Sequence, residues 1–336
     1  MTDATLDKGQ TDTGPSPDVY DELPDAPPKK RLRLSWVGKI SVAIVAFWVF
    51  MAFFGQFIAP YDEAFFIEED PNGEFFLDPT FMMANFEIAS YMGTDYIGRD
   101  VMSRIMWGAR TTIGISFAAT LLAYFLGITL GIAAAVAGGM TDTVLSRGVD
   151  AILAFPNIML GLIVIAAFSG QSYFGSPTDQ IILLILLAGF VYAASVFRIA
   201  RALGQDIMVQ DYVEAARARG EGLWWIISRE VLPNAAMPLA TDFGLRLVFV
   251  ILFISSLSFL GLGVPPPMAD WGSMVRENLA GLANGFFIDE ANGDFAAGAL
   301  ASVAPALAIA SLTIAINLIV DDISAQAGGS LAKKMV

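Results

Sequence analysis

The sequence predicts an all-α, polytopic membrane protein with six transmembrane helices and with both termini in the cytoplasm. Of its 336 residues, 56% are hydrophobic and 15% are charged, which is less charge than a soluble domain of this size carries. The apolar residues come in long uncharged runs, which indicates membrane spans and not one large core. The basic residues fall mainly on one side of the predicted topology, and the positive-inside rule makes that side cytoplasmic.

The composition excludes several classes of function. The chain contains no Cys and no His, which excludes disulfides, thiolate nucleophiles, Cys/His zinc sites and Ser-His-Asp triads. We therefore expect no catalytic residue, no metal site and no cofactor bound by this chain. The net charge of −14, without a basic stripe, argues against nucleic-acid binding. Solvated tails and loops account for the acidity.

The N-terminal part is predicted to form a tail, one span and an outer segment. Residues 1–35 begin rich in Pro, Asp and Thr and end in basic residues, so we expect a disordered cytoplasmic tail. Residues 36–60 are predicted to be the first transmembrane helix, whose uncharged stretch covers about 30 Å at the helical rise before Pro60 ends it. The polar and acidic residues 61–106 follow as an extracytoplasmic segment.

Five more spans are expected in residues 107–323, followed by a cytoplasmic tail over 324–336. The apolar runs that predict these spans lie within 111–137, 150–168, 181–197, 243–264 and 299–320. With this topology, all but four of the 19 Lys and Arg residues lie on the cytoplasmic side. The four exceptions are Arg99, Arg104, Arg110 and Arg276.

Small residues and prolines predict helices that are closely packed and bent. Gly127 and Gly131 are four residues apart in the second span, a spacing that lets two helices approach closely. Pro156 in the third span and Pro305 in the sixth each remove a backbone hydrogen bond and bend the helix. Such helices suit a pathway that opens alternately, although static bundles use them too.

The span interiors are nearly free of ionisable groups. Proton-coupled carriers usually need a buried acid or His at mid-span, so the sequence favours a path whose energy comes from elsewhere. At the inner end of the fifth span, the spacing predicts a pair between Asp242 and Arg246. Arg198 and Arg201 are expected at the C-terminal end of the fourth span, where a cation suits the helix dipole.

A short outer helix is expected over residues 98–108, lying at the membrane surface before the second span. Asp100 and Arg104 are four residues apart in it, so they are expected to pair. This structural role is preferred over a role in binding a solute, because it needs no specific ligand.

The connection between the fourth and fifth spans, residues 201–237, is more elaborate than a linker needs to be. Residues 206–219 favour a helix, and Gly220 suits the left-handed position after its end. A second helix is expected over 223–232, broken by Pro233 before the fifth span. We interpret this cytoplasmic loop as a docking surface; an ordinary amphipathic connector lying on the membrane is the alternative.

Four residues of the first loop helix support docking. Glu214 precedes Arg217 by three residues and is expected to brace it. Ala215 and Ala216 are small, which would let the backbone of a partner come close.

The order and spacing of Glu214-Ala215-Ala216, Gly220 and Leu232-Pro233 resemble the cytoplasmic loop of permease subunits in ATP-binding-cassette importers. Three further stretches extend the resemblance over roughly residues 30–325. They are similar to the C-type permease subunits of dipeptide, oligopeptide and nickel importers, and they read GTDYIGRD at 93–100, DAILAFP at 150–156 and SFLGLGVPPP at 258–267.

The resemblance implies an importer-type permease fold, with residues 107–323 as the permease core, in the bacterial inner membrane. It implies that peptides or similar small solutes cross, delivered by an extracytoplasmic binding protein. The implied partners are a second homologous permease, two cytoplasmic ATPase subunits and the lipid bilayer. ATP and Mg²⁺ would be used by those ATPases, since this chain has no phosphate-binding loop motif and should not be an enzyme.

By the same resemblance, the loop between the fourth and fifth spans is the segment that couples the chain to an ATPase. The residues assigned to this coupling are Asp211, Tyr212, Glu214, Ala215, Ala216, Arg217, Arg219, Gly220, Leu232 and Pro233. Two other functions remain open: a channel or carrier that works alone, and a membrane anchor without a path. The acidic outer segments 61–90 and 284–297 are weaker candidates for contact with a binding protein.

Overall fold

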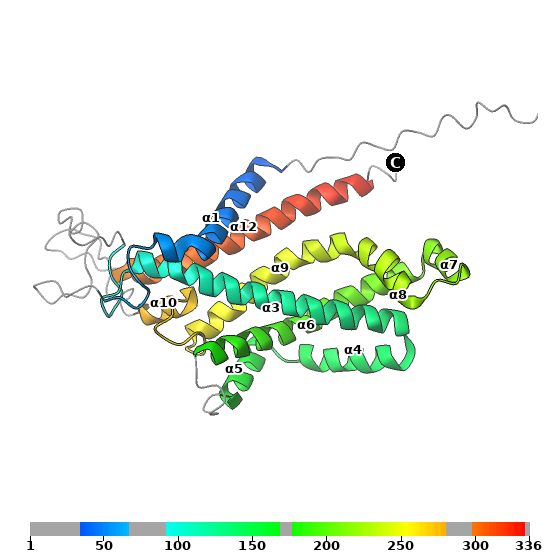
Figure 1. Ribbon diagram of the computed structural model, residues 1–336, viewed down its shortest axis with the longest axis horizontal. Coiled ribbons are helices and arrows are strands. Elements are labelled where there is room, and N and C mark those ends of the chain that lie inside the picture. The colour runs from blue at the N-terminus through cyan, green and yellow to red at the C-terminus, as the bar shows by residue number, and fades with distance from the viewer. Residues whose placement is uncertain (1–33, 67–91, 169–176, 280–297, 333–336) are drawn as a thin grey trace, which may run out of the picture. The chain divides into compact units, whose positions relative to one another are not determined.

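The computed structural model describes residues 34–66, 92–168, 177–279 and 298–332. These residues are mostly helical and form no β-strand, only two isolated bridges, Phe66–Arg99 and Thr94–Asp100. The predicted all-α fold class is confirmed (Figure 1). Five helices in this part are long and apolar enough to cross a membrane, and a bent pair of helices raises the number to six if it counts as one span. The predicted tail up to residue 33 and most of the two acidic segments lie outside the described residues.

The first span is helix α1, Trp36–Ile58, close to the predicted 36–60. Ser35 caps it by accepting a hydrogen bond from the Gly38 N–H at 3.0 Å. The Ser35 N–H donates to Asp322 Oδ2 at 2.8 Å, near the C-terminal end of the chain. The start of the first span and the end of the last therefore lie at the same end of the bundle, as an even number of spans requires.

Helix α3, Val101–Ala137, joins two elements that were predicted separately. The short outer helix expected over 98–108 is the first part of α3, not an independent surface helix, so that prediction was wrong. The predicted Asp100–Arg104 pair was also wrong. Asp100 caps the helix instead, accepting from the Ser103 N–H at 2.7 Å, and Arg104 reaches other carboxylates.

The third predicted span is two helices, α4 (Gly139–Leu153) and α5 (Asn157–Phe168), that meet at an angle of 87°. Pro156 was expected to bend one helix, but the chain leaves the helical conformation around it. At 1.5 Å per residue, α5 alone covers only about 18 Å, too little for the hydrocarbon layer.

Helix α6, Pro177–Met208, runs well past the predicted fourth span. Arg198 and Arg201 therefore lie within the helix and not at its end, which corrects the helix-dipole interpretation. Both side chains pair with α4: Arg198 Nη2 lies 2.7 Å from Asp150 Oδ1, and Arg201 Nη2 lies 2.6 Å from Asp142 Oδ2. These contacts hold α4 against α6.

Between the fourth and fifth spans lie α7 (Asp211–Ala218), α8 (Leu223–Ile226), a π-helical turn η3 (Ile227–Val231) and α9 (Leu232–Phe259). The single helix expected over 206–219 is interrupted at 209–210. The predicted break at Pro233 does not occur, because α8, η3 and α9 follow one another without a gap.

The π turn gives the physical reason why Pro233 is accommodated. The Leu232 N–H bonds to the Ile227 carbonyl, five residues back, so the turn is wider than in an α-helix. Pro233 then stands in the first turn of α9, where its missing N–H costs least. Residues 223–259 thereby form one apolar helix of 37 residues.

Helix α9 ends earlier than the predicted 264, at Phe259. Gly261 has φ +85°, and the Leu262 N–H bonds to the Leu257 carbonyl, the pattern of a glycine-terminated helix. A short helix that the sequence did not predict, α10 (Trp271–Glu277), follows.

The last helix, α12 (Gly298–Ala332), contains Pro305 as predicted but does not stop at 320. Asp321, Asp322 and most of the expected tail over 324–336 are helical. Charged residues do not by themselves end a helix that is already formed, and Ala325, Gln326 and Ala327 favour its continuation.

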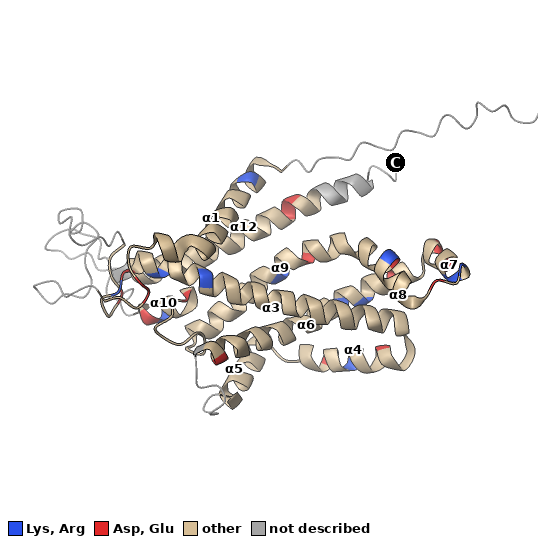
Figure 2. Ribbon diagram, in the orientation of Figure 1, with Lys and Arg blue, Asp and Glu red and all other residues tan. Residues whose placement is uncertain are grey.

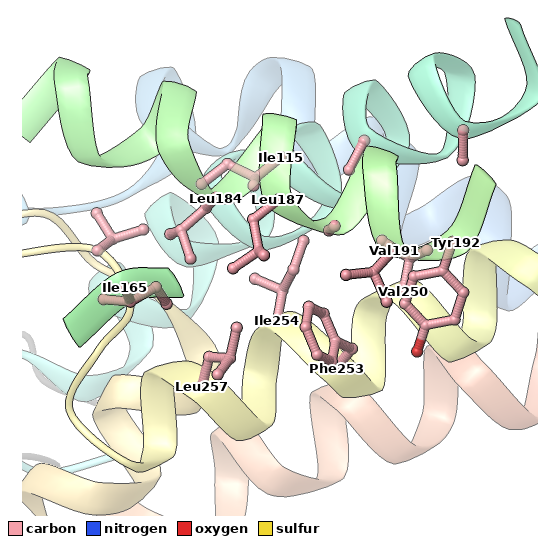
Figure 3. Packing of buried hydrophobic residues seen from close by; sticks show 14 residues of the cluster. Ile115, Ile165, Leu184, Leu187, Val191, Tyr192, Val250, Phe253, Ile254 and Leu257 are labelled. Atoms are coloured by element: carbon pink, nitrogen blue, oxygen red, sulfur yellow. The ribbon is translucent and has the colours of Figure 1, made fainter. Parts of the chain in front are cut away.

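Three buried apolar clusters hold the helices together. One joins α3, α5, α6 and α9, with Ile254 and Leu257 of α9 facing Leu184 and Leu187 of α6 (Figure 3). Close approach of α3 and α6 depends on glycine, as predicted: a Cβ atom at Gly127 would lie 2.6 Å from the Cβ of Val196. Glycine therefore lets these two helices pack tightly along their length.

Candidate functional site

The candidate site is the surface of α7 and the turn after it, termed here the α7 surface. Its exposed residues are Asp211, Tyr212, Glu214, Ala215, Arg217, Ala218, Arg219 and Gly220. Charged residues are sparse along most of the long helices but recur on α7 and on the turn η3 (Figure 2). The α7 surface is therefore a polar face attached to an apolar bundle.

Two buried residues fix α7 to that bundle. Val213 and Ala216 have no exposed surface and belong to a cluster with Ile207 of α6, Ile226 of α8 and Val231 of η3. The two side chains are three residues apart, so they share one face of the helix. The expectation that Ala216 stays open to a partner was wrong, because this methyl group packs into the chain's own core. Ala215 is exposed.

The end of α7 is built as the sequence predicts. Gly220 has φ +86°, a backbone conformation that strains other residues. Its N–H bonds to the Arg217 carbonyl at 2.9 Å, and the Glu221 N–H bonds to the Ala216 carbonyl at 3.2 Å. After the turn, the Arg219 guanidinium lies 5.9 Å from the centre of the Trp225 ring, which ties the turn to α8.

Other residues of the predicted site are arranged differently. Glu214 and Arg217 form no salt bridge; Arg217 Nη2 lies 4.0 Å from the sulfur of Met208. Leu232 and Pro233 are exposed, but they lie at the start of α9 and not on α7. The structure thus brings residues 211–220 together, whereas Leu232 and Pro233 lie on a separate helix.

A polar cluster joins α9 to α3 farther along the helix. The predicted pair is present, with Arg246 Nη2 3.1 Å from Asp242 Oδ1. The Tyr124 hydroxyl donates to Asp242 Oδ2 at 2.5 Å. The sequence did not predict the role of Tyr124, because it lies 118 residues from Asp242 and no spacing rule relates two residues so far apart. Asp242 therefore links the helix that follows the α7 surface to the long helix α3.

A second feature missed from the sequence is a buried ion-pair cluster at the start of α3. Arg104 Nη1 lies 2.8 Å and Arg99 Nε 2.7 Å from Asp95 Oδ2. Arg99 Nη2 also lies 2.9 Å from Glu277 Oε2 in α10. Burial raises the pKa of the Glu277 carboxyl, and the Arg99 charge acts in the opposite direction. Two cations and two carboxylates thus balance one another and bind α10 to the segment before α3.

Asp270 and Trp271 complete the junction between α10 and α3. Asp270 is fully buried, caps α10 by accepting from the Ser273 N–H at 3.0 Å, and accepts from the Thr112 hydroxyl at 2.9 Å. Burial raises the pKa of the Asp270 carboxyl. The Trp271 Nε1–H donates to the Ile105 carbonyl at 2.9 Å. These bonds make the junction rigid.

Comparison with known proteins assigns the chain to a family. Residues 127–325 match the family described as "Binding-protein-dependent transport system inner membrane component". The chain is 30% identical to the dipeptide transport system permease protein DppC of Haemophilus influenzae, over 87% of this chain and 89% of that protein. It is 29% identical to the glutathione transport system permease protein GsiD of Pectobacterium atrosepticum, over 81% and 79%.

Two further similarities extend the comparison. The peptide transport system permease protein SapC of Escherichia coli is 34% identical over 68% of this chain and 73% of its own length. Among solved structures, a chain of the MetNI methionine ABC transporter in inward-facing conformations aligns with a TM-score of 0.45 at 16% identity, covering 64% of this chain and 94% of that one. The family match covers more than half of the chain, so the chain belongs to the inner membrane components of binding-protein-dependent transport systems.

Proposed function

We propose that this chain is the permease subunit of an ATP-driven importer and that its α7 surface docks on a cytoplasmic ATPase. One observation supports this role above others. An exposed polar face is fixed, through the buried Val213 and Ala216, to the start of a helix that continues without a break into a membrane span. A push on α7 would therefore move the inner end of 223–259 as one body.

The transported solute is proposed to be a peptide or a similar small molecule. Relatives with 29–34% identity are described as permeases for dipeptides, peptides and glutathione, and they align with two thirds or more of this chain. An extracytoplasmic binding protein would deliver the solute, and a second permease would complete the path. ATP and Mg²⁺ would act in the ATPase subunits.

The topology proposed for this function places residues 201–237 in the cytoplasm. The contact of Ser35 with Asp322 supports two termini on one side, and the excess of basic residues supports the cytoplasm as that side. Residues 61–106 would then be extracytoplasmic, and 107–323 would form the permease core.

Reconstitution tests the proposal against a carrier that works alone. The chain is placed in vesicles with the ATPases, second permease and binding protein from its own organism, and uptake of a labelled dipeptide is measured with and without ATP. Uptake that needs both ATP and the ATPases is the expected result. Uptake by the chain alone, down a gradient and without ATPase subunits, would overturn it. An anchor without a path would give no uptake in either case, although it would still bind its partners.

The docking itself is tested by crosslinking. Because the chain has no natural Cys, Ala215→Cys carries one reactive thiol on the exposed face of α7. A short bifunctional reagent should join it to an ATPase subunit in the assembled complex. Met140→Cys, exposed on α4, is the control and should not crosslink to the ATPase at the same rate. Equal crosslinking of both would contradict docking at α7.

A further inference from the structure

A pocket near the end of α1 is lined by one acid and one base. It lies between α3, the start of α6, the loop before α10 and the segment after α1, and it encloses about 340 Å³, the lower end of the range for small-ligand sites. Glu63 and Arg110 are its charged residues, and Gly114, Ile115 and Ile185 are among the others. No residue of the α7 surface borders this pocket, so the proposed function does not use it.

The Glu63 carboxylate is held at the pocket by well-fixed neighbours. One of its oxygens, Oε2, accepts from the Ala269 N–H at 2.7 Å. The Tyr61 N–H donates to Ser103 Oγ at 3.2 Å, and the Trp107 Nε1–H donates to the Tyr61 carbonyl at 3.2 Å, which fixes the segment after α1 to α3. The other carboxylate oxygen, Oε1, has no hydrogen bond within the described residues. Glu63 therefore keeps one acceptor for a ligand.

The Arg110 guanidinium borders the same pocket with most of its donors unused. Its Nη1 donates to Gln56 Oε1 of α1, whereas Nε and Nη2 make no hydrogen bond to any residue that the structure describes. Burial raises the pKa of the Glu63 carboxyl, and the Arg110 charge acts in the opposite direction. Yet the two side chains form no salt bridge in the described part of the chain. Opposite charges that share a pocket without contact leave room for a ligand that carries both charges.

The level of the pocket suits the headgroup of a phospholipid. Glu63 follows soon after the end of α1 at Ile58, and Arg110 contacts Gln56 in the last turn of α1. Because α1 spans the hydrocarbon layer, these two charges lie near the boundary of that layer with water. Ile115 lies farther along α3 than Arg110 and adds an apolar wall beside the charges. The acyl chains of a bound lipid would leave along that wall.

We propose that the pocket binds a zwitterion whose primary ammonium group donates to Glu63 and whose phosphate or carboxylate accepts from Arg110. A phospholipid with an ethanolamine headgroup and a free dipeptide share this chemistry, and the position beside the end of α1 favours the lipid. A choline headgroup has no N–H to donate, and a glycerol headgroup has no cation, so neither satisfies Glu63. Charge-assisted hydrogen bonds at both ends of the ligand make the site selective.

Lipid binding to the full chain, purified in detergent, tests this chemistry without depending on transport. Native mass spectrometry measures the dissociation constants of phosphatidylethanolamine, phosphatidylcholine and phosphatidylglycerol with identical acyl chains. We expect the ethanolamine lipid to bind about tenfold more tightly than the other two, the difference that one charge-assisted hydrogen bond makes. Equal affinities of the three lipids would show an unselective lipid surface and would overturn the proposal.

Substitutions at the two charges assign the two ends of the ligand. Glu63→Gln keeps an acceptor for the Ala269 N–H and should remove the preference for ethanolamine over choline. Arg110→Gln should weaken both lipids about tenfold, because both carry a phosphate. Asp62→Asn and Arg276→Gln are the matched controls at exposed charges that do not line the pocket. They should change affinity by less than about twofold, since exposed charges are screened; losses equal to those at Glu63 and Arg110 would contradict the site.

Filling the pocket gives a readout that keeps both charges. Gly114 borders the pocket and has nothing within 4 Å of an added Cβ atom, so Gly114→Leu should occupy the cavity without displacing a helix. The preference for the ethanolamine lipid should then be lost. Gly148→Leu is the control, because Gly148 is equally open and lies on α4, away from the pocket. An unchanged preference in Gly114→Leu would place the lipid elsewhere and contradict the proposal.

A free dipeptide distinguishes the two sources of the zwitterion. Alanyl-alanine is added to the lipid-depleted chain and to the same variants. Binding of alanyl-alanine that is lost in Glu63→Gln and in Arg110→Gln would support the site and identify a free zwitterion as its ligand. Selective binding of the ethanolamine lipid, with no binding of alanyl-alanine, would identify the headgroup. If neither binds selectively to the unmodified chain, the proposal is wrong.

Discussion

Gly131 of α3 lies directly against the carbonyl oxygen of Phe197 in α6: a Cβ atom at residue 131 would stand 2.7 Å from that oxygen. A backbone atom cannot move aside as a flexible side chain does, so Gly131→Ala must push the two helices apart. We expect it to lower the free energy of unfolding by about 1–3 kcal/mol, the usual cost of overpacking.

Gly114→Ala is the matched control for that change, because it lies on the same helix with nothing within 4 Å of its added methyl group. It should raise stability by up to about 1 kcal/mol, since Ala favours a helix more than Gly does. Thermal unfolding of the purified chain in detergent measures both. Equal shifts of the two variants would show that the α3–α6 contact is not tight.

Ala215 and Ala216 are neighbours with opposite environments, so one substitution at each separates docking from folding. Ala215→Trp adds a bulky group to the exposed face and should change stability by less than about 0.5 kcal/mol, as surface changes usually do. It should still weaken copurification of the ATPase subunits. If those subunits bind Ala215→Trp as tightly as the unmodified chain, docking on this face is wrong.

Ala216→Leu acts on the other side of the same helix. Ala216 is fully buried between α6, α8 and η3, so the larger side chain should destabilise the chain by about 1–3 kcal/mol. Unfolding in detergent, without any partner present, detects the loss. An unchanged unfolding temperature would mean that α7 is not anchored as the structure places it.

Gly220 offers a test of whether α7 must be held rigidly. Gly220→Val places a β-branched side chain at φ +86°, which costs about 1–2 kcal/mol locally and should loosen the end of α7. We expect the variant to reach the membrane and to bind ATPases weakly, with little ATP-dependent uptake. Gly222→Val is the control, because residue 222 has φ −76°, an ordinary value for Val. Normal uptake by Gly220→Val would exclude a role for this turn in coupling.

The sequence predicts the apolar spans and the end of α7 because these depend on local properties. Apolar runs as long as the hydrocarbon layer is thick locate α1, α6, α9 and α12. Glycine is the residue type that adopts the positive φ of position 220 without strain, so Gly220 marks the end of α7. Helix lengths are less predictable, since Pro233 and Asp321 lie in helices that continue past them. In the first case a π turn directly before Pro233 lets the helix continue although proline lacks an N–H, and no residue type in the sequence indicates a π turn.

The buried contacts between distant segments could not be predicted from spacing. Arg99 and Glu277 are 178 residues apart, and Tyr124 and Asp242 are 118 apart. Such pairs form because the fold brings distant segments of the chain together, and many combinations of polar residues fit the sequence equally well. The local i,i+4 rule finds Asp242–Arg246, yet it gave the wrong partner for Arg104 because a fully buried cation takes the carboxylates that surround it.

The buried ion-pair cluster should be far more important for stability than an exposed pair. Arg104→Met leaves Asp95 and Glu277 buried with one cation between them, and breaking a buried pair typically costs about 3–5 kcal/mol. Arg198→Met is the matched control: its pair with Asp150 is largely exposed and should contribute less than about 1 kcal/mol. Similar unfolding temperatures for the two variants would contradict the burial of the cluster.

Glu63 should lower the free energy of unfolding as the pH rises, which is opposite to the effect of a carboxylate that is stabilised by a salt bridge. Burial raises the pKa of the Glu63 carboxyl above its usual value of 4.5, against the opposing effects of the Ala269 N–H and of Arg110. The folded chain therefore holds this proton more tightly than the unfolded chain does. The stabilising contribution is complete below pH 4.5 and is lost as the pH rises through the folded-state pKa.

Glu63→Gln removes that dependence while keeping an oxygen that can accept from the Ala269 N–H, a bond of 2.7 Å to Glu63 Oε2 in the unmodified chain. We expect both forms to unfold at the same temperature in acid and the variant to unfold at a higher temperature at neutral pH. Glu214→Gln, at an exposed carboxyl, controls for the effect of pH on the remainder of the chain. A difference between Glu63→Gln and the unmodified chain that stays constant with pH would show that the Glu63 carboxyl is not desolvated, because only a proton bound more tightly in the folded state makes that difference grow as the pH rises.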